Sequence, residues 1–181
     1  ELGCSHMIFA HNDILFHKDA IDNLVDLYER RKNEGYLFHA GIPTGWGLGW
    51  TDGWETKLED VDKIIPEDYT EGAYLILWIM TKETFERVGP FDEKFTDGTM
   101  NLTNDWLHSM DVKGVKYTGT RLARFYHFGA VTTKVNNIEA QKLGKVNEEH
   151  YMLKWGGFWN LERFQTPFGG MTDMIKCPWC S

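Results

Sequence analysis

The sequence predicts one α/β domain, or a large piece of one, and three observations support this fold class. The chain has 181 residues and is 42% hydrophobic, which is enough for one sizeable core. Short apolar runs of strand length alternate with segments in which apolar residues recur every three or four positions. No internal repeat or low-complexity segment interrupts this alternation. We therefore expect a mixed, mostly parallel sheet flanked by helices.

The first predicted strand and helix lie within residues 7–35. Residues 7–10 read MIFA, an uninterrupted apolar run that is typical of a buried, parallel strand covered on both faces. Asp19 is placed to cap a helix, in which apolar residues recur at i, i+3, i+4 and i+7 from Ile21. Gly35 is expected to end this helix.

Further strands and helices are predicted along the rest of the chain. They are a strand at 36–42, a strand at 73–81, a short helix from Thr81 to Gly89, a helix at 105–113 capped by Thr103 or Asn104 and ended by Gly114, strands at 115–117 and 122–127, and a helix at about 137–153. The segment GIPTGWGLGWTDGWETKLED, residues 41–60, is too long and too aromatic to be only a connector.

Composition limits the classes of partner. The formal net charge of −8 argues against binding to nucleic acid or to an anionic membrane surface, because phosphate groups select basic faces. No apolar run approaches the roughly 20 residues of a membrane span, and no secretory signal is visible. Three unevenly spaced cysteines favour a reducing compartment, so we expect a cytoplasmic protein. The chain opens at Glu1 without an initiator Met, so its true N-terminus is expected to lie upstream or to have been removed.

The tripeptide His11-Asn12-Asp13 directly follows the first predicted strand. Ligands of open α/β sheets gather beyond the carboxyl ends of strands. An Asp at such an end, with an imidazole from another strand end, makes an oxygen and nitrogen site suited to Mn²⁺ or Mg²⁺. The alternative is an Asx-type turn with no ligand, which on the tripeptide alone is the commoner case.

Two further positions have both a functional and a structural interpretation. Asp105 is expected in the first turn of a helix, where the macrodipole stabilises a carboxylate, and it is also a candidate general base. His127 ends an apolar strand, where a lone His is more often a hydrogen-bonded core or turn residue than a ligand.

Aromatic and cysteine spacings give two weaker signals. Trp46, Trp50 and Trp54 recur every four residues in the Gly-rich segment, and indole faces stack on sugar rings and bases, although core packing explains them at least as well. Cys177 and Cys180 have the spacing of a zinc or redox pair, but tetrahedral zinc needs four ligands and the chain has no second CxxC.

Taken in order, several segments resemble the family 2 inverting glycosyltransferases, which have the GT-A fold. The strand ending in HND, residues 11–13, is similar to variants of that family's D-x-D metal motif. EGAYLILWIMTKETFERVGPFDEKF, residues 71–95, is similar to a stretch that ends V-G-x-F-D-E-x-F. NDW at 104–106, YHFGAVTT at 126–133 and EEHYMLKWGG at 148–157 are similar to the E-D pair, the H-x-x-G-x-S/T segment and the Y-x-x-K-W-G ending.

The resemblance implies a GT-A-like body over residues 1–157, with a C-terminal extension at 158–181. It implies that Asp13 binds a divalent cation, Mn²⁺ or Mg²⁺, with His127 as a second candidate ligand, and that Asn12 also contacts the bound cofactor. The cation would neutralise the departing nucleoside diphosphate.

Transfer from a nucleoside-diphosphate sugar is the reaction that the resemblance implies. Asp105 would be the general base, which takes a proton from the acceptor hydroxyl as it attacks the anomeric carbon from the opposite face, through an oxocarbenium-like transition state and with inversion. Gly72, Asn104 and the three tryptophans 46, 50 and 54 would bind the acceptor, a glycan or a similar hydroxyl compound.

This sequence also departs from the family's pattern. His11 stands at the first position of the D-x-D motif, and Asn104 stands where an acidic residue is usual. Only six residues precede Met7, so the donor-binding half is expected upstream or on a partner chain. The alternative function is a carbohydrate-binding or scaffold module without catalysis. A phosphoesterase ranks third, because few His and Asp residues cluster.

Overall fold

The computed structural model describes residues 4–41, 45–46, 75–95, 100–128 and 137–171. The chain divides into two compact units. Unit 1 comprises Glu1–Gly89 and Val115–Val135, and unit 2 comprises Pro90–Gly114 and Asn136–Ser181. Each unit has a hydrophobic core of its own. The predicted glycosyltransferase body ends at residue 157, but unit 2 continues beyond that residue.

The larger sheet of unit 1 has four strands in the order β1-β5-β3-β6. They are β1 (His6–Ala10), β3 (Tyr36–Gly41), β5 (Leu77–Thr81) and β6 (Lys116–Thr120). β5 is antiparallel to both β1 and β3, and among the described strands of this sheet the β3–β6 pair alone is parallel. The predicted mixed sheet is confirmed, but its description as mostly parallel is wrong for these strands. An apolar run indicates covered faces and carries no information about strand direction.

β1 confirms the first predicted strand and corrects its predicted surroundings. It lies at an edge of the described sheet and pairs antiparallel with β5, with Ile8 opposite Ile79. The Ile8 residue is 40% exposed, so the expectation of a buried, parallel strand is wrong here. On the other face, Phe9 stacks on Trp78 with ring centroids 5.0 Å apart. The apolar run thus reflects contacts on both faces of an edge strand.

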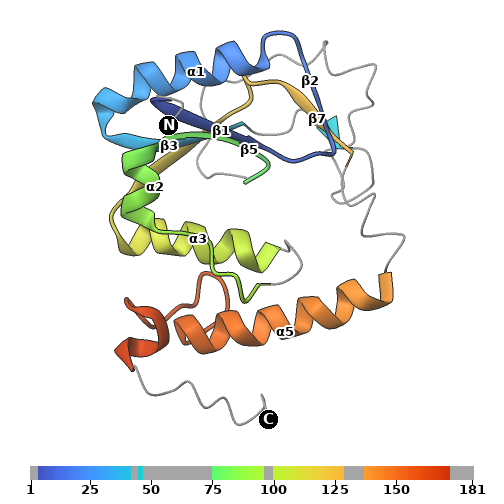
Figure 1. Ribbon diagram of the computed structural model, residues 1–181, viewed down its shortest axis with the longest axis vertical. Helices are drawn as coiled ribbons and strands as arrows, with labels where there is room; N and C mark the ends of the chain where they lie inside the picture. Colours follow the sequence, from blue (N-terminus) through green and yellow to red (C-terminus); the bar gives the residue numbers. More distant parts are fainter. Residues whose placement is uncertain (1–3, 42–44, 47–74, 96–99, 129–136, 172–181) are drawn as a thin grey trace. The chain divides into compact units, whose positions relative to one another are not determined.

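Helix α1 (Ala20–Arg31) covers one face of this sheet (Figure 1). Its buried residues Leu24 and Tyr28 join a core that includes Leu77 and Ile79 of β5. The predicted amphipathic helix is therefore confirmed. A short 3-10 turn, η1 (Lys32–Glu34), extends it, and Gly35 ends it in the left-handed region with φ of +85°.

The start of α1 differs from the prediction in one detail. Asp19 precedes the helix, but its side chain makes no capping hydrogen bond. Its Oδ2 instead lies 3.4 Å from His17 Nδ1 and 3.6 Å from Arg124 Nη2. Asp19 therefore occupies the predicted N-cap position, but its carboxylate contacts partners outside the helix and does not cap the helix amides.

Helix α2 (Lys82–Val88) follows β5 directly and agrees with the prediction. The Thr81 Oγ1 caps it by accepting a hydrogen bond from the Thr84 amide at 3.2 Å. Gly89 ends the helix, and its amide donates to the Phe85 carbonyl at 2.8 Å. A threonine cap and a glycine stop are local signals, which explains why the sequence predicts this helix well.

A second, three-stranded sheet of unit 1 has the order β2-β7-β4. Its strands are β2 (Ile14–Phe16), β4 (Gly45–Trp46) and β7 (Phe125–His127). β2 is antiparallel to β7, and β4 is parallel to it. The turn between β1 and β2 contains the tripeptide His11-Asn12-Asp13, so this turn links the two sheets.

Unit 2 contains two long helices, α3 (Met100–Val112) and α5 (Asn137–Trp155), which pack against each other. α3 begins five residues before the predicted start at 105, so Thr103 and Asn104 lie inside it and the predicted cap is wrong. Asp105 therefore lies in the second turn, and the first turn of α3 holds no acidic residue. Among the described residues, no helix is long and apolar enough to cross a membrane.

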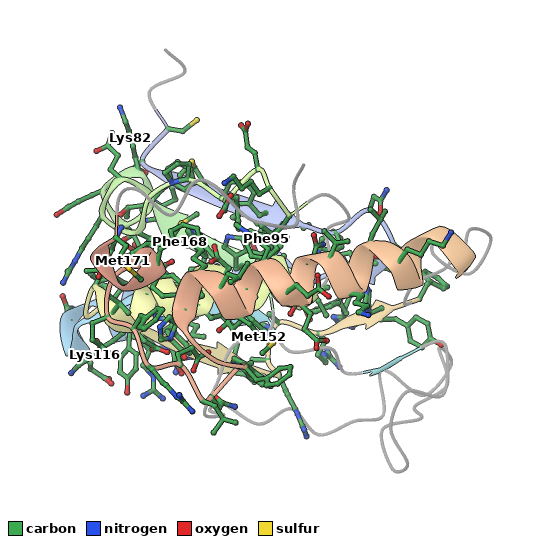
Figure 2. The ribbon with its side chains drawn as sticks, turned by 90° about the horizontal axis from the view of Figure 1, so that it is seen from below. Lys82, Phe95, Lys116, Met152, Phe168 and Met171 are labelled. Atoms are coloured by element: carbon green, nitrogen blue, oxygen red, sulfur yellow. The ribbon has the colours of Figure 1, made fainter. Side chains whose placement is uncertain are left out.

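The core of unit 2 forms around the C-terminal half of α5. Phe95, Tyr151 and Trp155 are buried together. Figure 2 shows Phe95 and Phe168 beside α5, and the Phe168 ring centroid lies 6.1 Å from that of His150. Aromatic side chains from three segments of unit 2 thus meet on this helix.

The chain reverses after α5 at Gly156. This residue has φ of +75°, and a Cβ there would lie 2.9 Å from the ring of Phe164. The carbonyl of Trp155 accepts hydrogen bonds from the amides of Arg163 and Phe164, at 3.0 and 3.1 Å. Glycine at position 156 therefore permits both the turn and the close approach of the returning chain.

Candidate functional site

Three side chains of unit 1 gather at the turn that follows β1. His127 Nε2 lies 3.1 Å from Asp13 Oδ1, which is hydrogen-bond distance. His11 Nδ1 lies 3.9 Å from the same carboxylate oxygen, and the His11 and His127 ring centroids are 5.7 Å apart. Each residue offers one ligand atom, and these atoms all lie within 4.8 Å of one another. The cluster has the residue types and the spacing to hold a metal ion.

Backbone hydrogen bonds hold this cluster in place. The pairing of β2 with β7 sets Ile14 opposite His127, so Asp13, the residue before Ile14, lies beside the imidazole. The Phe128 amide donates to the Asp13 carbonyl at 2.9 Å. The His11 amide donates to the Ile76 carbonyl, also at 2.9 Å. Residues that are 114 positions apart in sequence are thus brought together by the pairing of two short strands.

The three side chains differ in exposure, from core to solvent. His127 is buried, with 7% of the residue exposed, whereas the side chains of Asp13 and His11 are 22% and 41% exposed. Burial lowers the pKa of His127, and the nearby Asp13 carboxylate acts in the opposite direction. Burial thus favours the neutral imidazole, which is the form that binds metals.

Of the other residues singled out in the sequence, the structure describes some and not others. Asn12 is exposed in the turn between His11 and Asp13. Gly72, Trp50 and Trp54 lie outside the described residues, as does the Cys177–Cys180 pair, and only the backbone of Trp46 is described, in β4. The acceptor-binding roles of Gly72 and of the three tryptophans stay predictions.

Asp105, the predicted general base, belongs to unit 2 and is 2% exposed. Trp155 Nε1 donates a hydrogen bond to its Oδ1 at 2.7 Å, and Lys154 Nζ donates to its Oδ2 at 3.0 Å. Both oxygens of the carboxylate therefore contact donors from α5. This arrangement suits a group that holds α3 to α5, and a base role would in addition require contact with a substrate hydroxyl.

Lys154 makes a second contact, with Asp92. Its Nζ donates to Asp92 Oδ2 at 2.9 Å, and His150 Nε2 lies 3.0 Å from the same oxygen. Burial acts to raise the pKa of Asp92, but the hydrogen bonds from His150, Lys154 and the Lys94 amide outweigh it and hold the pKa below its usual range. One ammonium group thus serves two carboxylates.

Asn104, predicted to bind the acceptor, is 7% exposed and lies within α3, next to Asp105. Asp13 and His127 belong to unit 1 and Asp105 to unit 2. The convergence of all three on one cleft therefore stays a prediction. The contact between Asp13 and His127 is present in unit 1.

Sequence reasoning missed three participants. His11 was treated as a replacement within a motif, although its ring lies beside the other two members of the cluster. Lys154 and Trp155 entered only as letters of the K-W-G ending, although they are the partners of Asp105. The sequence does show an acidic residue in one predicted helix, Asp105, and a Lys-Trp pair at the end of another. Their spacing along the chain does not indicate that they contact each other.

Neither a scan against protein-family models nor a search of curated proteins finds a match for this chain.

Proposed function

We propose that this chain is the cation-binding and acceptor part of an inverting glycosyltransferase. Together with its donor-binding half, supplied by an upstream segment or a partner chain, the enzyme would transfer a sugar from a nucleoside-diphosphate sugar to a hydroxyl group of a glycan or similar acceptor. The observation that carries the proposal is the contact of Asp13 with His127, 3.1 Å apart across 114 positions of sequence. The resemblance to family 2 glycosyltransferases assigns these same two residues to one cation.

Each named residue has a distinct task in this proposal. Asp13 and His127 hold a divalent cation, which when bound neutralises charge on the departing diphosphate. Asn12, exposed on the same turn, contacts the sugar nucleotide. Asp105 accepts the proton of the acceptor hydroxyl, which attacks the anomeric carbon from the face opposite the leaving group. Attack from that face inverts the configuration.

A second candidate function is a carbohydrate-binding or scaffold module that does not catalyse transfer. One observation favours it: Asp105 is buried, and both of its oxygens already contact donors from α5. In that case Asp105 serves the packing of unit 2 alone. The two functions differ in whether nucleotide binding depends on a metal.

Titration calorimetry with UDP, GDP and free pyrophosphate, each with and without Mn²⁺, separates the two candidates. We expect nucleotide binding that requires Mn²⁺ and that is lost in Asp13→Ala. Asp19→Ala is the matched control, because Asp19 is a partly exposed aspartate of unit 1 outside the cluster. Release of nucleoside diphosphate from sugar nucleotides then measures turnover.

Two results would overturn the glycosyltransferase proposal. One is the absence of Mn²⁺-dependent binding of UDP, GDP and free pyrophosphate, because pyrophosphate contacts the cation without needing the base pocket of the donor-binding half. The other is binding of oligosaccharides that does not depend on a metal, together with no turnover, which would support the module.

A further inference from the structure

The cluster after β1 contains two imidazoles and a single carboxylate. A D-x-D motif would place two carboxylates on this turn, but His11 occupies the first position. We propose that His11, Asp13 and His127 together bind a first-row transition-metal ion such as Zn²⁺ or Mn²⁺, in preference to Mg²⁺ or Ca²⁺. This inference deepens the proposed function, since it concerns the same cation site and makes His11 a third ligand.

The distances in the cluster are close to those that one ion requires. Ligand atoms about 2.0–2.2 Å from a metal lie roughly 2.8–3.6 Å from their adjacent ligand atoms in octahedral or tetrahedral geometry. Asp13 Oδ1 lies 3.1 Å from His127 Nε2 and 3.9 Å from His11 Nδ1. All three ligand atoms lie within 4.8 Å of one another. Small rotations of the exposed His11 ring would therefore complete the set.

The chemistry of the donors determines which ion is favoured. Imidazole nitrogen suits Zn²⁺, Fe²⁺, Ni²⁺ and Cu²⁺, whereas Mg²⁺ and Ca²⁺ take oxygen ligands and Mg²⁺ keeps several waters. Two of the three side-chain donors are nitrogens. Affinity for a given nitrogen and oxygen site rises from Mn²⁺ towards Cu²⁺ and remains high at Zn²⁺. Of Zn²⁺, Mn²⁺ and Mg²⁺, Zn²⁺ should therefore bind most tightly, Mn²⁺ more weakly, and Mg²⁺ least.

Hydrogen bonds fix the backbone of all three residues of the cluster. The His11 amide donates to the Ile76 carbonyl, and the Phe128 amide donates to the Asp13 carbonyl. Strand pairing fixes His127 opposite Ile14. His127 is buried and the His11 side chain is 41% exposed, so the cluster extends from the core to the surface. Three protein ligands leave at least one coordination position for water or a diphosphate oxygen.

Equilibrium dialysis of the purified chain against Zn²⁺, Mn²⁺ and Mg²⁺, without nucleotide, tests this inference. The chain should carry Cys4→Ser, Cys177→Ser and Cys180→Ser in every sample, because thiolates bind Zn²⁺. We expect one Zn²⁺ per chain, weaker Mn²⁺ binding, and no Mg²⁺ binding at the concentrations that saturate Mn²⁺. Co²⁺, added in place of Zn²⁺, gives d–d absorption bands that report nitrogen and oxygen ligands directly.

The variants are His11→Ala, Asp13→Ala and, as the matched control, His6→Ala. His6 is a histidine of β1 outside the cluster, near Tyr28 and Glu29. We expect His11→Ala to weaken Zn²⁺ and Mn²⁺ binding by at least about tenfold, because outer-shell partners alone account for about 10–100-fold in metal sites. His6→Ala should bind as the parent chain does. Circular dichroism spectra confirm that each variant is folded.

Three outcomes would overturn the inference: Mg²⁺ that binds as tightly as Mn²⁺, Zn²⁺ affinity unchanged by His11→Ala, or no metal binding at all. Failure of the proposed function looks different. In that case the metal binds as described, but UDP, GDP and free pyrophosphate all fail to bind to the metal-loaded chain.

Discussion

Lys154 bridges Asp92 and Asp105, with its ammonium nitrogen 2.9 Å from Asp92 Oδ2 and 2.8 Å from Asp105 Oδ1. The bridge joins the loop before α3, α3 itself and α5, all within unit 2. Trp155, the next residue, donates to Asp105 as well. The consecutive residues Lys154 and Trp155 thus bring an ammonium group and an indole N–H to the same buried carboxylate.

Lys154→Met should strongly destabilise unit 2. The substitution keeps an unbranched apolar chain but leaves the Asp105 carboxylate, 2% exposed, without its ammonium partner. Removing one member of a buried pair costs about 3–5 kcal/mol, and the partial exposure of Asp92 favours the lower end of this range. Urea unfolding followed by tryptophan fluorescence measures the change.

Lys82→Met is the matched control for that substitution. Lys82 pairs with Glu86 at 3.6 Å, but its side chain is 72% exposed. Exposed pairs of this kind contribute about 0.5 kcal/mol or less, so its unfolding curve should nearly match that of the parent chain. Equal losses in the two variants would show that the bridge does not stabilise unit 2.

Replacing Gly144, inside α5, or Gly156, just after it, by alanine should change the stability in opposite directions. Gly144 lies inside α5, and a Cβ there meets nothing within 4 Å, so Gly144→Ala should stabilise by about 0.5–1 kcal/mol. Gly156→Ala should destabilise by at least about 1 kcal/mol, because φ is +75° and the new Cβ would lie 2.9 Å from Phe164. Thermal unfolding followed by circular dichroism gives both values. A shift of the same sign in both variants would contradict this account of the turn.

Local signals made part of this fold predictable from sequence. The cap and stop of α2, at Thr81 and Gly89, are properties of neighbouring residues, and the apolar period of α1 records its buried face. Strand direction is not recorded in that way. β5 reads as a continuous apolar run, yet it is antiparallel to both neighbours, because pairing is decided by segments far along the chain.

The same distinction applies to the candidate sites. The resemblance to family 2 glycosyltransferases implies that Asp13 and His127 share a cation, and the contact between them is present in unit 1. His11 was overlooked because its ring reaches the same carboxylate only through the geometry of the turn. The link from Asp105 to Lys154 and Trp155 depends on how α3 packs on α5, which neither helix reveals alone.

His39 should make unit 1 less stable in acid. It is fully buried in β3, neither ring nitrogen has a hydrogen-bond partner among the described residues, and Thr118 faces it on β6. Burial, assisted by Arg31, lowers the pKa of His39 to about 4, so the folded chain disfavours the protonated ring. The unfolded chain takes up the proton near pH 6.5, so stability is lost as the pH falls from there towards 4.

The size of this effect follows from the pKa difference. Between pH 7 and pH 4.5, His39 should account for a loss of roughly 2 kcal/mol. His39→Phe, which cannot titrate, should remove that part of the pH dependence, and urea unfolding of both chains at the two pH values measures it. His6→Phe serves as the control because His6 is partly exposed. An identical loss in the parent chain and in His39→Phe would rule out His39 as the titrating group.

Asp105→Asn and Asp92→Asn together separate a base from a structural carboxylate. Each substitution removes one of the two carboxylate charges that contact the Lys154 ammonium group. Both should therefore destabilise unit 2, but only the loss of a general base should lower turnover, by about 100-fold or more, with nucleotide affinity unchanged. Rates are compared for folded protein, below the unfolding transition of each variant, with the donor that the parent chain turns over. Equal turnover in the two variants would assign Asp105 to the packing of α3 on α5, because a structural effect acting through Lys154 reaches both carboxylates.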